Sequence, residues 1–263
     1  MDRLTIIKIG GKVIENSAHL DSLLRILATS KDKIILIHGG GKKIDIYSEK
    51  LGIKVTMVEG RRVTGSETLE VVQMVLAGLL NKNIVSKLQG FQCNAVGLTG
   101  ADGNLIRAVK RPVKNGVDYG WVGDIVEVNP GFLDHFIKNG MVPVIGSLTH
   151  DGNGNILNTN ADTVASEIAI SMSSLYLTEL VYCFDMPGVL KNMSDENSVI
   201  PEIRSSEYQK IKSTGAINKG MVPKINSAFE AIQRGVGGVL ITNASNIENY
   251  LTGKPVTGTF ILQ

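Results

Sequence analysis

Three segments of the chain place a lysine beside glycines: Lys8–Gly11, His38–Lys42 and Gly220–Lys224. Glycine lets the backbone approach a ligand closely, so that successive N–H groups can converge on phosphate oxygens, above all where a helix begins. Lysine adds the positive charge that balances the phosphate. Each of the three segments is therefore a candidate phosphate site.

The first two segments share a setting that strengthens this interpretation. Apolar runs at residues 4–9 and 33–37 lead into the glycines, and a helix-compatible stretch follows each cluster. A Gly-Gly pair after a strand is more often a simple turn, but two such pairs in the same strand–glycine–helix order favour binding. No GxxxxGK[ST] loop and no strand-linked GxGxxG motif occurs in the sequence, so any nucleotide is held in another way.

The composition narrows the classes of partner. The chain has 263 residues, 43% of them hydrophobic, and 27 lysines and arginines against 25 acidic residues. This length supports a sizeable core in one large α/β domain or two joined lobes. The balanced charge predicts no nucleic-acid partner. No apolar run reaches the ~18 residues that span a bilayer, which predicts no membrane partner and a cytoplasmic location. The four histidines lack metal-site spacing, so we expect no metal bound by the protein itself.

Short β-branched runs alternate with helical stretches, which predicts an α/β fold with a mainly parallel sheet and helices on both faces. A long helix is expected over Ser66–Leu88, where apolar residues recur every three or four positions. A shorter helix is expected over Thr163–Met172, and a hairpin, able to act as a lid, over Arg107–Asn129. The strands are expected at 4–9, 34–37, 95–98, 142–145, 180–184 and 238–241.

Seven short motifs, in order, resemble the acetylglutamate kinase family, and the resemblance runs from Leu4 to Leu262. It implies an amino acid kinase (carbamate kinase-like) fold: an open αβα sandwich with a mainly parallel central sheet and two lobes. Residues 1–174 would form the N-acyl-amino-acid-binding lobe with a β-hairpin lid, and residues 175–263 the ATP-binding lobe. The motifs are Lys8–Gly11, His38–Gly41, Gly60–Thr64, Ala77–Gly78 with Asn81–Lys82, Asn158–Asp162, Asp185–Gly188 and Gly220–Lys224.

The family reaction is the transfer of the γ-phosphoryl group of ATP to the side-chain carboxylate of N-acetyl-L-glutamate, the second step of arginine biosynthesis. A glutamate carboxylate, with a usual pKa of about 4.3, is already ionised at neutral pH and needs no general base. Catalysis then depends on aligning two anions and neutralising the charge that spreads over the phosphoryl oxygens. Lysines and backbone amides suit that task.

The resemblance implies three catalytic residues. Lys8 and Lys224 would stabilise the transferring phosphoryl group, and Asp162 would orient both ammonium groups. Each also has an ordinary structural interpretation: a strand-end lysine, a helix-surface lysine and a helix N-cap. Lys8 interrupts an otherwise apolar strand, however, and therefore needs a partner.

Substrate and nucleotide contacts are likewise implied by the resemblance. Arg62 would bind the α-carboxylate of the substrate, with adjacent Arg61 as the competing candidate, because a planar guanidinium matches a carboxylate. Asn158 would hydrogen-bond the substrate, although turn chemistry also explains an asparagine there. Magnesium would arrive with the phosphates of ATP. The remaining contacts are Gly40 and Gly41 for the substrate, and Gly10, Gly11, Asp185, Gly188, Asn218 and Gly220 for phosphate or nucleotide.

The sequence departs from the family pattern in two places, and it leaves several alternative functions. Lys219 replaces the glycine or aspartate that many family members have before the Gly-Met pair, which leaves the local nucleotide contacts open. The chain begins almost at its first strand, without the extra helix of the arginine-inhibited hexameric branch, so we expect an arginine-insensitive homodimer. Alternative functions are an N-succinylglutamate kinase, a carrier-linked aminoadipate kinase of the same fold, or a catalytically silent nucleotide-sensing regulatory protein.

Overall fold

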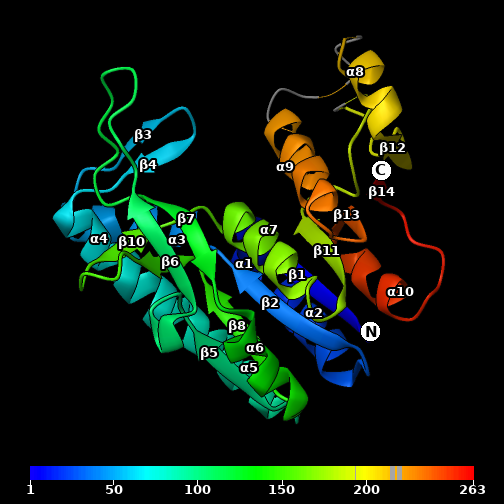
Figure 1. Cartoon of the computed structure of the whole chain (residues 1–263), viewed down its shortest axis with the longest axis horizontal. Coiled ribbons are helices and arrows are strands. Elements are labelled where there is room, and N and C mark those ends of the chain that lie inside the picture. The colour runs from blue at the N-terminus through cyan, green and yellow to red at the C-terminus, as the bar shows by residue number, and fades with distance from the viewer. Residues whose placement is uncertain (193, 214–216, 218–220) are drawn as a thin grey trace. The chain divides into compact units, whose positions relative to one another are not determined.

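The computed structural model describes residues 1–192, 194–213, 217 and 221–263 (Figure 1). Its backbone divides into two compact units: a first unit of residues 1–36 with 165–263, and a second unit of residues 37–164. Two of the expected nucleotide residues, Asn218 and Gly220, and the departure at Lys219 lie outside the described residues.

The first unit is built on a mainly parallel sheet with the strand order β12-β14-β13-β11-β1-β2. Strand β1 is parallel to β11, and β11 to β13; β14 is antiparallel to β13. Strands β1 and β11 are apolar runs buried along most of their length, as expected where helices cover both faces of a sheet. Their bounds are β1 Arg3–Ile9, β2 Lys33–His38, β11 Leu177–Phe184, β12 Glu202–Arg204, β13 Gly238–Asn243 and β14 Thr259–Leu262; the last two residues of β2 belong to the second unit.

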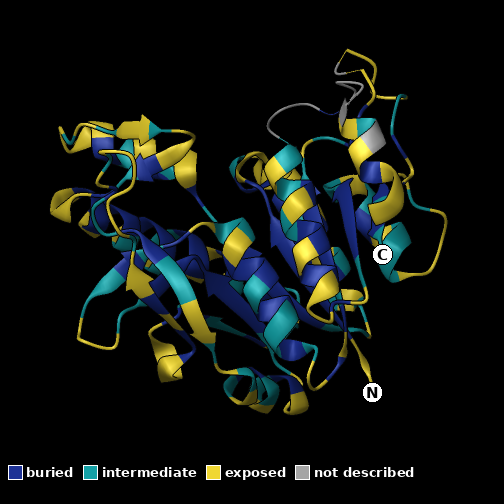
Figure 2. Cartoon of the chain, turned by 45° about the horizontal axis from the view of Figure 1, so that its top comes forward, coloured by how far each residue is buried: buried dark blue, intermediate teal, exposed yellow. Residues whose placement is uncertain are grey.

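The helices of this unit bury one apolar stripe each. In α2, Leu20, Leu23, Leu24 and Leu27 are buried at helical spacing, and the side chain of Asn16 caps the first turn. Figure 2 shows the strands as buried ribbon and the helices with exposed outer faces. The bounds are α1 Gly11–Glu15, α2 Ser17–Thr29, α7 Ala161–Met172, α8 Ser205–Ser213, α9 Val222–Gln233, η3 Ala244–Asn246 and α10 Ile247–Leu251; the first four residues of α7 belong to the second unit.

The second unit combines parallel and antiparallel pairs. Strand β5 is parallel to β8, while a separate four-stranded sheet has the order β10-β9-β6-β7, and β3 pairs with β4 in a hairpin. Its strands are β3 Thr56–Val58, β4 Arg61–Val63, β5 Ala95–Leu98, β6 Ile106–Lys110, β7 Gly123–Val128, β8 Val142–Gly146, β9 Leu148–His150 and β10 Ile156–Asn158. Its helices are α3 Gly41–Lys50, α4 Ser66–Gln73, η1 Met74–Leu80, α5 Asn81–Gly90, η2 Asp102–Asn104 and α6 Pro130–Lys138.

The expected elements are confirmed, with one difference in detail. All six expected strands are present, as is the antiparallel hairpin β6–β7 within Arg107–Asn129. The helix expected over Ser66–Leu88 is continuous but changes to π-helical geometry over Met74–Leu80. The apolar residues across this segment keep the three- and four-residue spacing of an α-helix, so the periodicity did not indicate the i→i+5 geometry.

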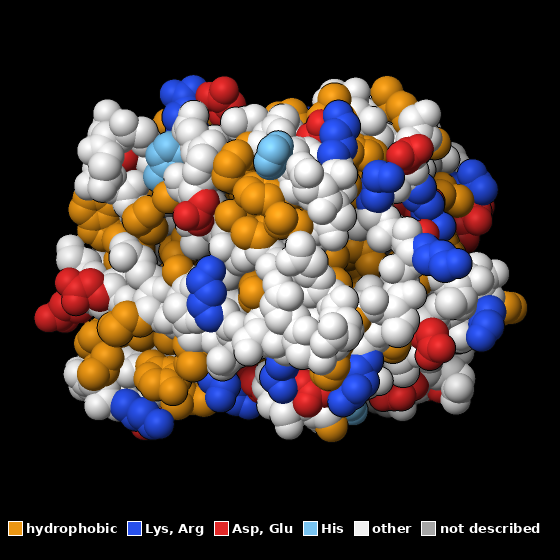
Figure 3. Space-filling view, turned by 90° about the horizontal axis from the view of Figure 1, so that it is seen from below, with side chains coloured by type: hydrophobic (Ala, Val, Ile, Leu, Met, Phe, Trp, Pro, Cys, Tyr) orange, Lys and Arg blue, Asp and Glu red, His pale blue; other side chains and the backbone are white. Residues whose placement is uncertain are grey.

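Two surface findings complete the description. In the described residues, no helix is long and apolar enough to cross a membrane. On the face shown in Figure 3, lysine and arginine side chains are interspersed with aspartate and glutamate side chains, as the net charge of +2 leads one to expect.

Candidate active site

Lys8 lies near the carboxyl end of β1, where parallel strands commonly present ligand-binding residues. In the register of β1 and β11 it is opposite Tyr182. Only 8% of Lys8 is exposed, and its Nζ lies 4.9 Å from the centroid of the Phe184 ring. The lysine that interrupts the apolar strand thus places its charge against an aromatic ring.

Lys224 reaches the same ring from the opposite end of the sequence. It is the third residue of α9, just after Pro223, which is well tolerated in a first helical turn. Its Nζ lies 4.2 Å from the centroid of Phe184. The fold of the first unit therefore brings together Lys8 and Lys224, which are two of the three residues expected to be catalytic.

Gly10 has a packing role that the sequence did not indicate. Its N–H donates to the carbonyl of Cys183 at 2.8 Å, so the backbone of β11 already uses this donor. A Cβ on Gly10 would lie 3.2 Å from that carbonyl oxygen and 3.3 Å from Cδ1 of Phe184. Gly11, the first residue of α1, would gain only one contact, with Glu15 at 3.8 Å. Of this pair, Gly11 is the better amide donor to an anion.

Asp185 follows β11 directly and forms an ion pair with Lys12, with 2.5 Å between Oδ2 and Nζ. Burial raises the pKa of the Asp185 carboxyl, whereas the hydrogen bond and charge of Lys12 lower it, and the net effect is a decrease. Both residues, with Phe184, line a cavity of about 230 Å³. Gly188 is buried, and a Cβ on it would be 2.8 Å from Oγ1 of Thr259. Close packing alone therefore explains this glycine.

In the second unit, Gly40 and Gly41 lie at the start of α3. A Cβ on Gly40 would lie 2.3 Å from Cδ1 of Leu80, so that only glycine fits between the two helices. The carbonyl of Gly41 accepts a hydrogen bond from Nη2 of Arg62 at 3.1 Å. The N–H groups in the first turn of α3 have no acceptor within the helix, as at every helix start.

Arg62 in β4 is fixed by its neighbours. Its side chain is 8% exposed, and Nη1 donates to Oδ1 of Asp45 at 2.6 Å. The guanidinium has five N–H donors, so these two bonds leave capacity for a further anion. Arg61 is exposed instead and lines a cavity of about 680 Å³ together with Arg111 and Lys114. The two adjacent arginines therefore have different surroundings.

Asn158 is a strand residue rather than a turn residue. It ends β10, paired with Leu148, and its side-chain amide donates to Oγ1 of Thr64 at 3.0 Å. Its backbone N–H donates to the carbonyl of Trp121 at 2.8 Å. The turn interpretation is wrong for this residue, which instead connects β10 to the hairpin expected to form a lid.

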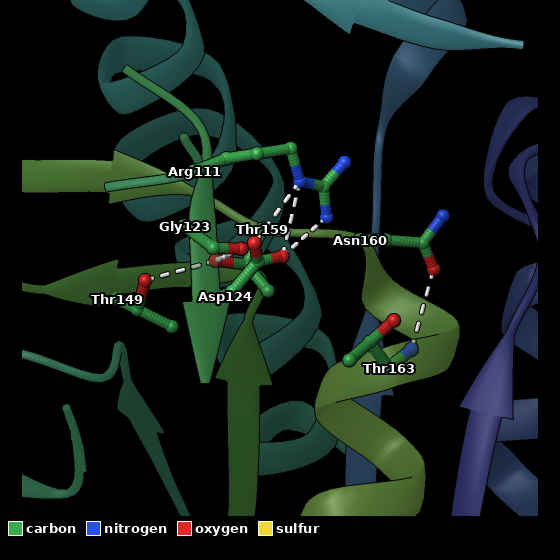
Figure 4. Close-up of polar contacts among 7 residues, drawn as sticks. All are labelled: Arg111, Gly123, Asp124, Thr149, Thr159, Asn160 and Thr163. Carbon is green, nitrogen blue, oxygen red and sulfur yellow. Dashed lines mark hydrogen bonds and ion pairs between the residues drawn. The ribbon is translucent and has the colours of Figure 1, made fainter. Parts of the chain in front are cut away.

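The polar contacts beside Asn158 fasten that hairpin to the sheet (Figure 4). Oγ1 of Thr149 and Oγ1 of Thr159 lie 2.9 Å apart, and Thr159 also donates to the carbonyl of Gly123. A Cβ on Gly123 would be 2.9 Å from both hydroxyl oxygens, so only glycine fits at this position of β7. Across the hairpin, Nε of Arg111 donates to Oδ1 and Oδ2 of Asp124 at 3.0 and 3.2 Å.

Asp162 is the second residue of α7, and it does not cap that helix. The side chain of Asn160 accepts from the N–H groups of Asp162 and Thr163 at 2.8 and 3.2 Å, which is the geometry of an N-cap. Figure 4 shows the bond from Thr163. The N-cap interpretation of Asp162 is therefore wrong. An acidic side chain in the first turn still interacts favourably with the helix dipole.

His38 and Asn81, both within the expected motifs, form a buried network. Asn81 Nδ2 lies 3.1 Å from Nε2 of His38 and 2.9 Å from the carbonyl of Val144, while Nδ1 of His38 lies 3.0 Å from the carbonyl of Gly39. Burial lowers the pKa of His38 to about 4, against a smaller opposing effect of the Gly39 carbonyl. The imidazole is therefore neutral at physiological pH.

Two functional candidates were missed from the sequence. Phe184 looked like an ordinary apolar strand end, and the Arg111–Asp124 pair carried no motif. Only the pairing of β1 with β11 and of β6 with β7 brings these residues to their partners. Within the described ranges, no group of three or more histidine, cysteine, aspartate or glutamate side chains could hold a metal ion.

The chain matches known proteins over nearly its whole length. Residues 3–243 match the model of the amino acid kinase family. Acetylglutamate kinase from Cytophaga hutchinsonii is 50% identical over 98% of both chains, and that from Phocaeicola vulgatus is 51% identical over 94% of this chain and 95% of its own. The structure of carbamate kinase from Giardia covers 99% of both chains with a TM-score of 0.71 at 16% identity, a likeness of fold.

Proposed function

The chain belongs to the amino acid kinase family, and on this premise we propose how its residues carry out the reaction of an ATP-dependent kinase of N-acetyl-L-glutamate. An oxygen of the substrate's side-chain carboxylate forms a bond to the γ-phosphorus of ATP. The bond from that phosphorus to the β–γ bridging oxygen breaks, and ADP leaves with the electron pair. The product is N-acetyl-L-glutamyl 5-phosphate, and no proton has to be transferred.

The observation that carries this proposal is the convergence of Lys8 and Lys224 on one ring. Phosphoryl transfer gives the protein little covalent chemistry to do, so positioned positive charge supplies most of the catalysis. The two ammonium groups would stabilise the charge on the transferring phosphoryl group. Gly11 supports them as an amide donor, and Asp162 keeps the catalytic role that the resemblance implies. Asn218 and Gly220 stay proposals without a structural description.

We propose that the second unit binds the acyl amino acid. Arg62 would bind the α-carboxylate, since its guanidinium is already oriented by Asp45 and the carbonyl of Gly41. Gly40 and Gly41 would contribute from the first turn of α3, and Asn158 from the end of β10. The relatives named acetylglutamate kinase favour the acetyl substrate over the succinyl, carrier-linked and sensor alternatives.

Several finer assignments rest on the family resemblance. ATP is the phosphoryl donor, and Mg²⁺ would arrive on its phosphates and neutralise part of their charge. The assignment of residues 1–174 to the acyl amino acid and of 175–263 to ATP, the homodimer, the cytoplasmic location and the insensitivity to arginine are all proposals. Light scattering of the full chain and an assay with millimolar arginine would test the homodimer and the insensitivity.

The decisive experiment is hydroxylamine trapping of the acyl phosphate, with MgATP and one of three acceptors: N-acetyl-L-glutamate, N-succinyl-L-glutamate or free glutamate. We expect a strong signal with N-acetyl-L-glutamate and little with the others. A preference for the succinyl compound would keep the mechanism and change the substrate. Silence with all three acceptors, while ATP still binds, would overturn the proposal in favour of the sensor.

A further inference from the structure

We propose that His38 and Asn81 are positioning residues, which hold the glycine turn before α3 so that its N–H groups face the acyl amino acid. The inference rests on the proposed function, because it takes from it the binding role of Gly40 and Gly41. Neither of the two side chains has to touch the substrate. All the residues that carry the argument belong to the second unit.

His38 ends β2, is fully buried and is neutral, because burial lowers its pKa to about 4. A neutral imidazole has one N–H donor and one acceptor nitrogen. Nδ1 lies 3.0 Å from the carbonyl oxygen of Gly39, which can only accept, and Nε2 lies 3.1 Å from the amide nitrogen of Asn81, which can only donate. The proton is therefore on Nδ1, and the two partners fix both the tautomer and the orientation of the ring.

His38 acts on the peptide group between Gly39 and Gly40. Residues 39–41 are three glycines, the residue type that loses most backbone freedom on folding. The Gly39–Gly40 peptide is trans and planar, so the carbonyl of Gly39 and the N–H of Gly40 point in opposite directions. Since Nδ1 of His38 holds this carbonyl, it also sets the direction of the Gly40 N–H, which is one of the donors expected to bind the substrate.

Asn81, the first residue of α5, holds His38 in turn. Its side chain is buried, and Nδ2 donates to the carbonyl of Val144 in β8 at 2.9 Å as well as to His38. With oxygen and nitrogen of the amide exchanged, two oxygens would face each other at Val144, so the neighbours determine which atom donates. Gly97 in β5 leaves room for this amide, because a Cβ there would lie 2.0 Å from Oδ1 of Asn81. One side chain thus joins α5 to β2 and β8.

The π-helical segment before α5 packs against the same turn. A Cβ on Gly40 would lie 2.3 Å from Cδ1 of Leu80 and 2.9 Å from Cδ2 of Leu76, both in η1. The backbone N–H of Asn81 donates to the carbonyl of Leu76, which is the i→i+5 bond of π geometry, a geometry frequent at functional sites. The segment therefore places two leucines against Gly40 and leads directly into Asn81.

The first test removes the bonds of His38 in the full-length chain. His38→Phe removes both and should raise KM for N-acetyl-L-glutamate about 10-fold, because the donor that orients the turn is lost. His38→Asn, whose Nδ2 can take the place of Nδ1, should keep most of the affinity. KM for ATP should change less than about twofold in either variant. An unchanged KM for N-acetyl-L-glutamate in His38→Phe, or equal increases in the two variants, would overturn the inference.

A second variant tests whether Asn81 acts through His38. Asn81→Ala should raise KM for N-acetyl-L-glutamate about 3- to 5-fold, and it carries the test alone if His38→Phe does not fold. Adding it to His38→Phe should raise KM no further, since substitutions within one hydrogen-bond network are not additive. Effects that multiply in the double variant would contradict the pairing of the two residues.

A matched control separates positioning from packing. Ile137→Val in α6 shortens a buried side chain of the same unit, at a cost in stability similar to that of one lost hydrogen bond. It should leave KM for both substrates unchanged, and urea unfolding measures the stability of every variant. If KM for N-acetyl-L-glutamate rises with the loss of stability in Ile137→Val as well, the effect is one of packing and the inference fails.

A readout other than activity keeps the inference separate from the proposed function. In ¹⁵N NMR spectra of the full-length chain, the imidazole of His38 should carry its proton on Nδ1. Addition of N-acetyl-L-glutamate should shift the amide signal of Gly40, and His38→Phe should reduce that shift. If the unmodified protein phosphorylates none of the three acceptors, the proposed function fails even where the tautomer is as expected. A proton on Nε2 in an active enzyme would overturn only the positioning role.

Discussion

The cations expected at the active site have different neighbours in the two units. In the second unit, Arg62 and Arg111 are each bonded to a carboxylate, Asp45 and Asp124. In the first unit, Lys8 and Lys224 lie against the neutral ring of Phe184. The arginines are thus fixed in direction by hydrogen bonds to carboxylates, while each of the two lysines has an aromatic ring among its neighbours.

This difference matches the two anions of the proposed reaction. A substrate carboxylate is flat and is recognised by a guanidinium whose orientation is set in advance. The charge on a transferring phosphoryl group is spread over three oxygens, and compact ammonium groups can stabilise it from several directions. We infer that the second unit provides selectivity for the acceptor and the first unit provides rate.

The most severe test of this division is Lys8→Ala. If the first unit supplies rate, kcat should fall about 100- to 1,000-fold, since one preorganised charge at the reacting group is removed. The acyl-phosphate assay measures kcat, and Lys50→Ala, on the exposed surface of α3, serves as the matched lysine control. Full turnover in Lys8→Ala would contradict this division, because the rate would then not depend on Lys8.

A pH titration tests the polar network of the second unit. His38 has its pKa lowered to about 4 by burial, so between pH 6.5 and 4 the unfolded chain binds a proton that the folded chain does not. The free energy of unfolding should therefore decrease as pH falls through this range, by on the order of 3 kcal/mol at pH 4.

Urea unfolding at a series of pH values measures this decrease. His38→Gln should flatten the dependence, whereas His135→Gln, at an exposed position of α6, should not. A wild-type free energy of unfolding that stays constant between pH 6.5 and 4 would mean that the buried imidazole does not stay neutral.

Arg62→Lys tests selectivity. Loss of the planar fork should raise KM for N-acetyl-L-glutamate about 10- to 100-fold, because one charge-assisted hydrogen bond contributes about 1.5–3 kcal/mol. KM for ATP should change little. Arg61→Lys is the matched comparison. If it raises KM for the acyl amino acid while Arg62→Lys does not, the competing arginine is the true ligand.

Gly123→Ala sharpens the claim that the second unit is rigidly packed around its polar groups. The added methyl group would come within 2.9 Å of two threonine hydroxyls, and overpacking of this kind costs about 1–3 kcal/mol. The midpoint of thermal unfolding measures the loss. Gly78→Ala, where a Cβ meets nothing within 4 Å, should be neutral or slightly stabilising. Equal midpoints for the two variants would contradict the close packing at Gly123.

The sequence predicted what depends on local pattern. Alternation of β-branched runs with helical stretches gave the parallel strands, and an isolated lysine in the apolar run of β1 indicated that Lys8 needs a partner. The short strands β3 and β4 were missed, since three residues such as Arg61–Val63 are too few for a period of two to be read.

The partners could not be predicted, because they depend on register between distant strands. Lys8 meets Phe184 only since β1 and β11 pair with Lys8 opposite Tyr182, and 173 residues separate Lys12 from Asp185. The cap of α7 shows the same limit on a smaller scale: Asn160 and Asp162 are both good caps by type, and only the backbone decides that Asn160 accepts the bonds.

The division of the chain has a consequence for its synthesis on the ribosome. Residues 37–164 form a compact unit from one continuous stretch, whereas the first unit joins residues 1–36 to residues 165–263. Strand β1 leaves the exit tunnel well before its neighbour β11 is made, so six buried residues of β1 wait without that partner. The apolar strand that carries Lys8 therefore stays without one of its two neighbours while more than 160 further residues are made, and it is exposed to aggregation during that time.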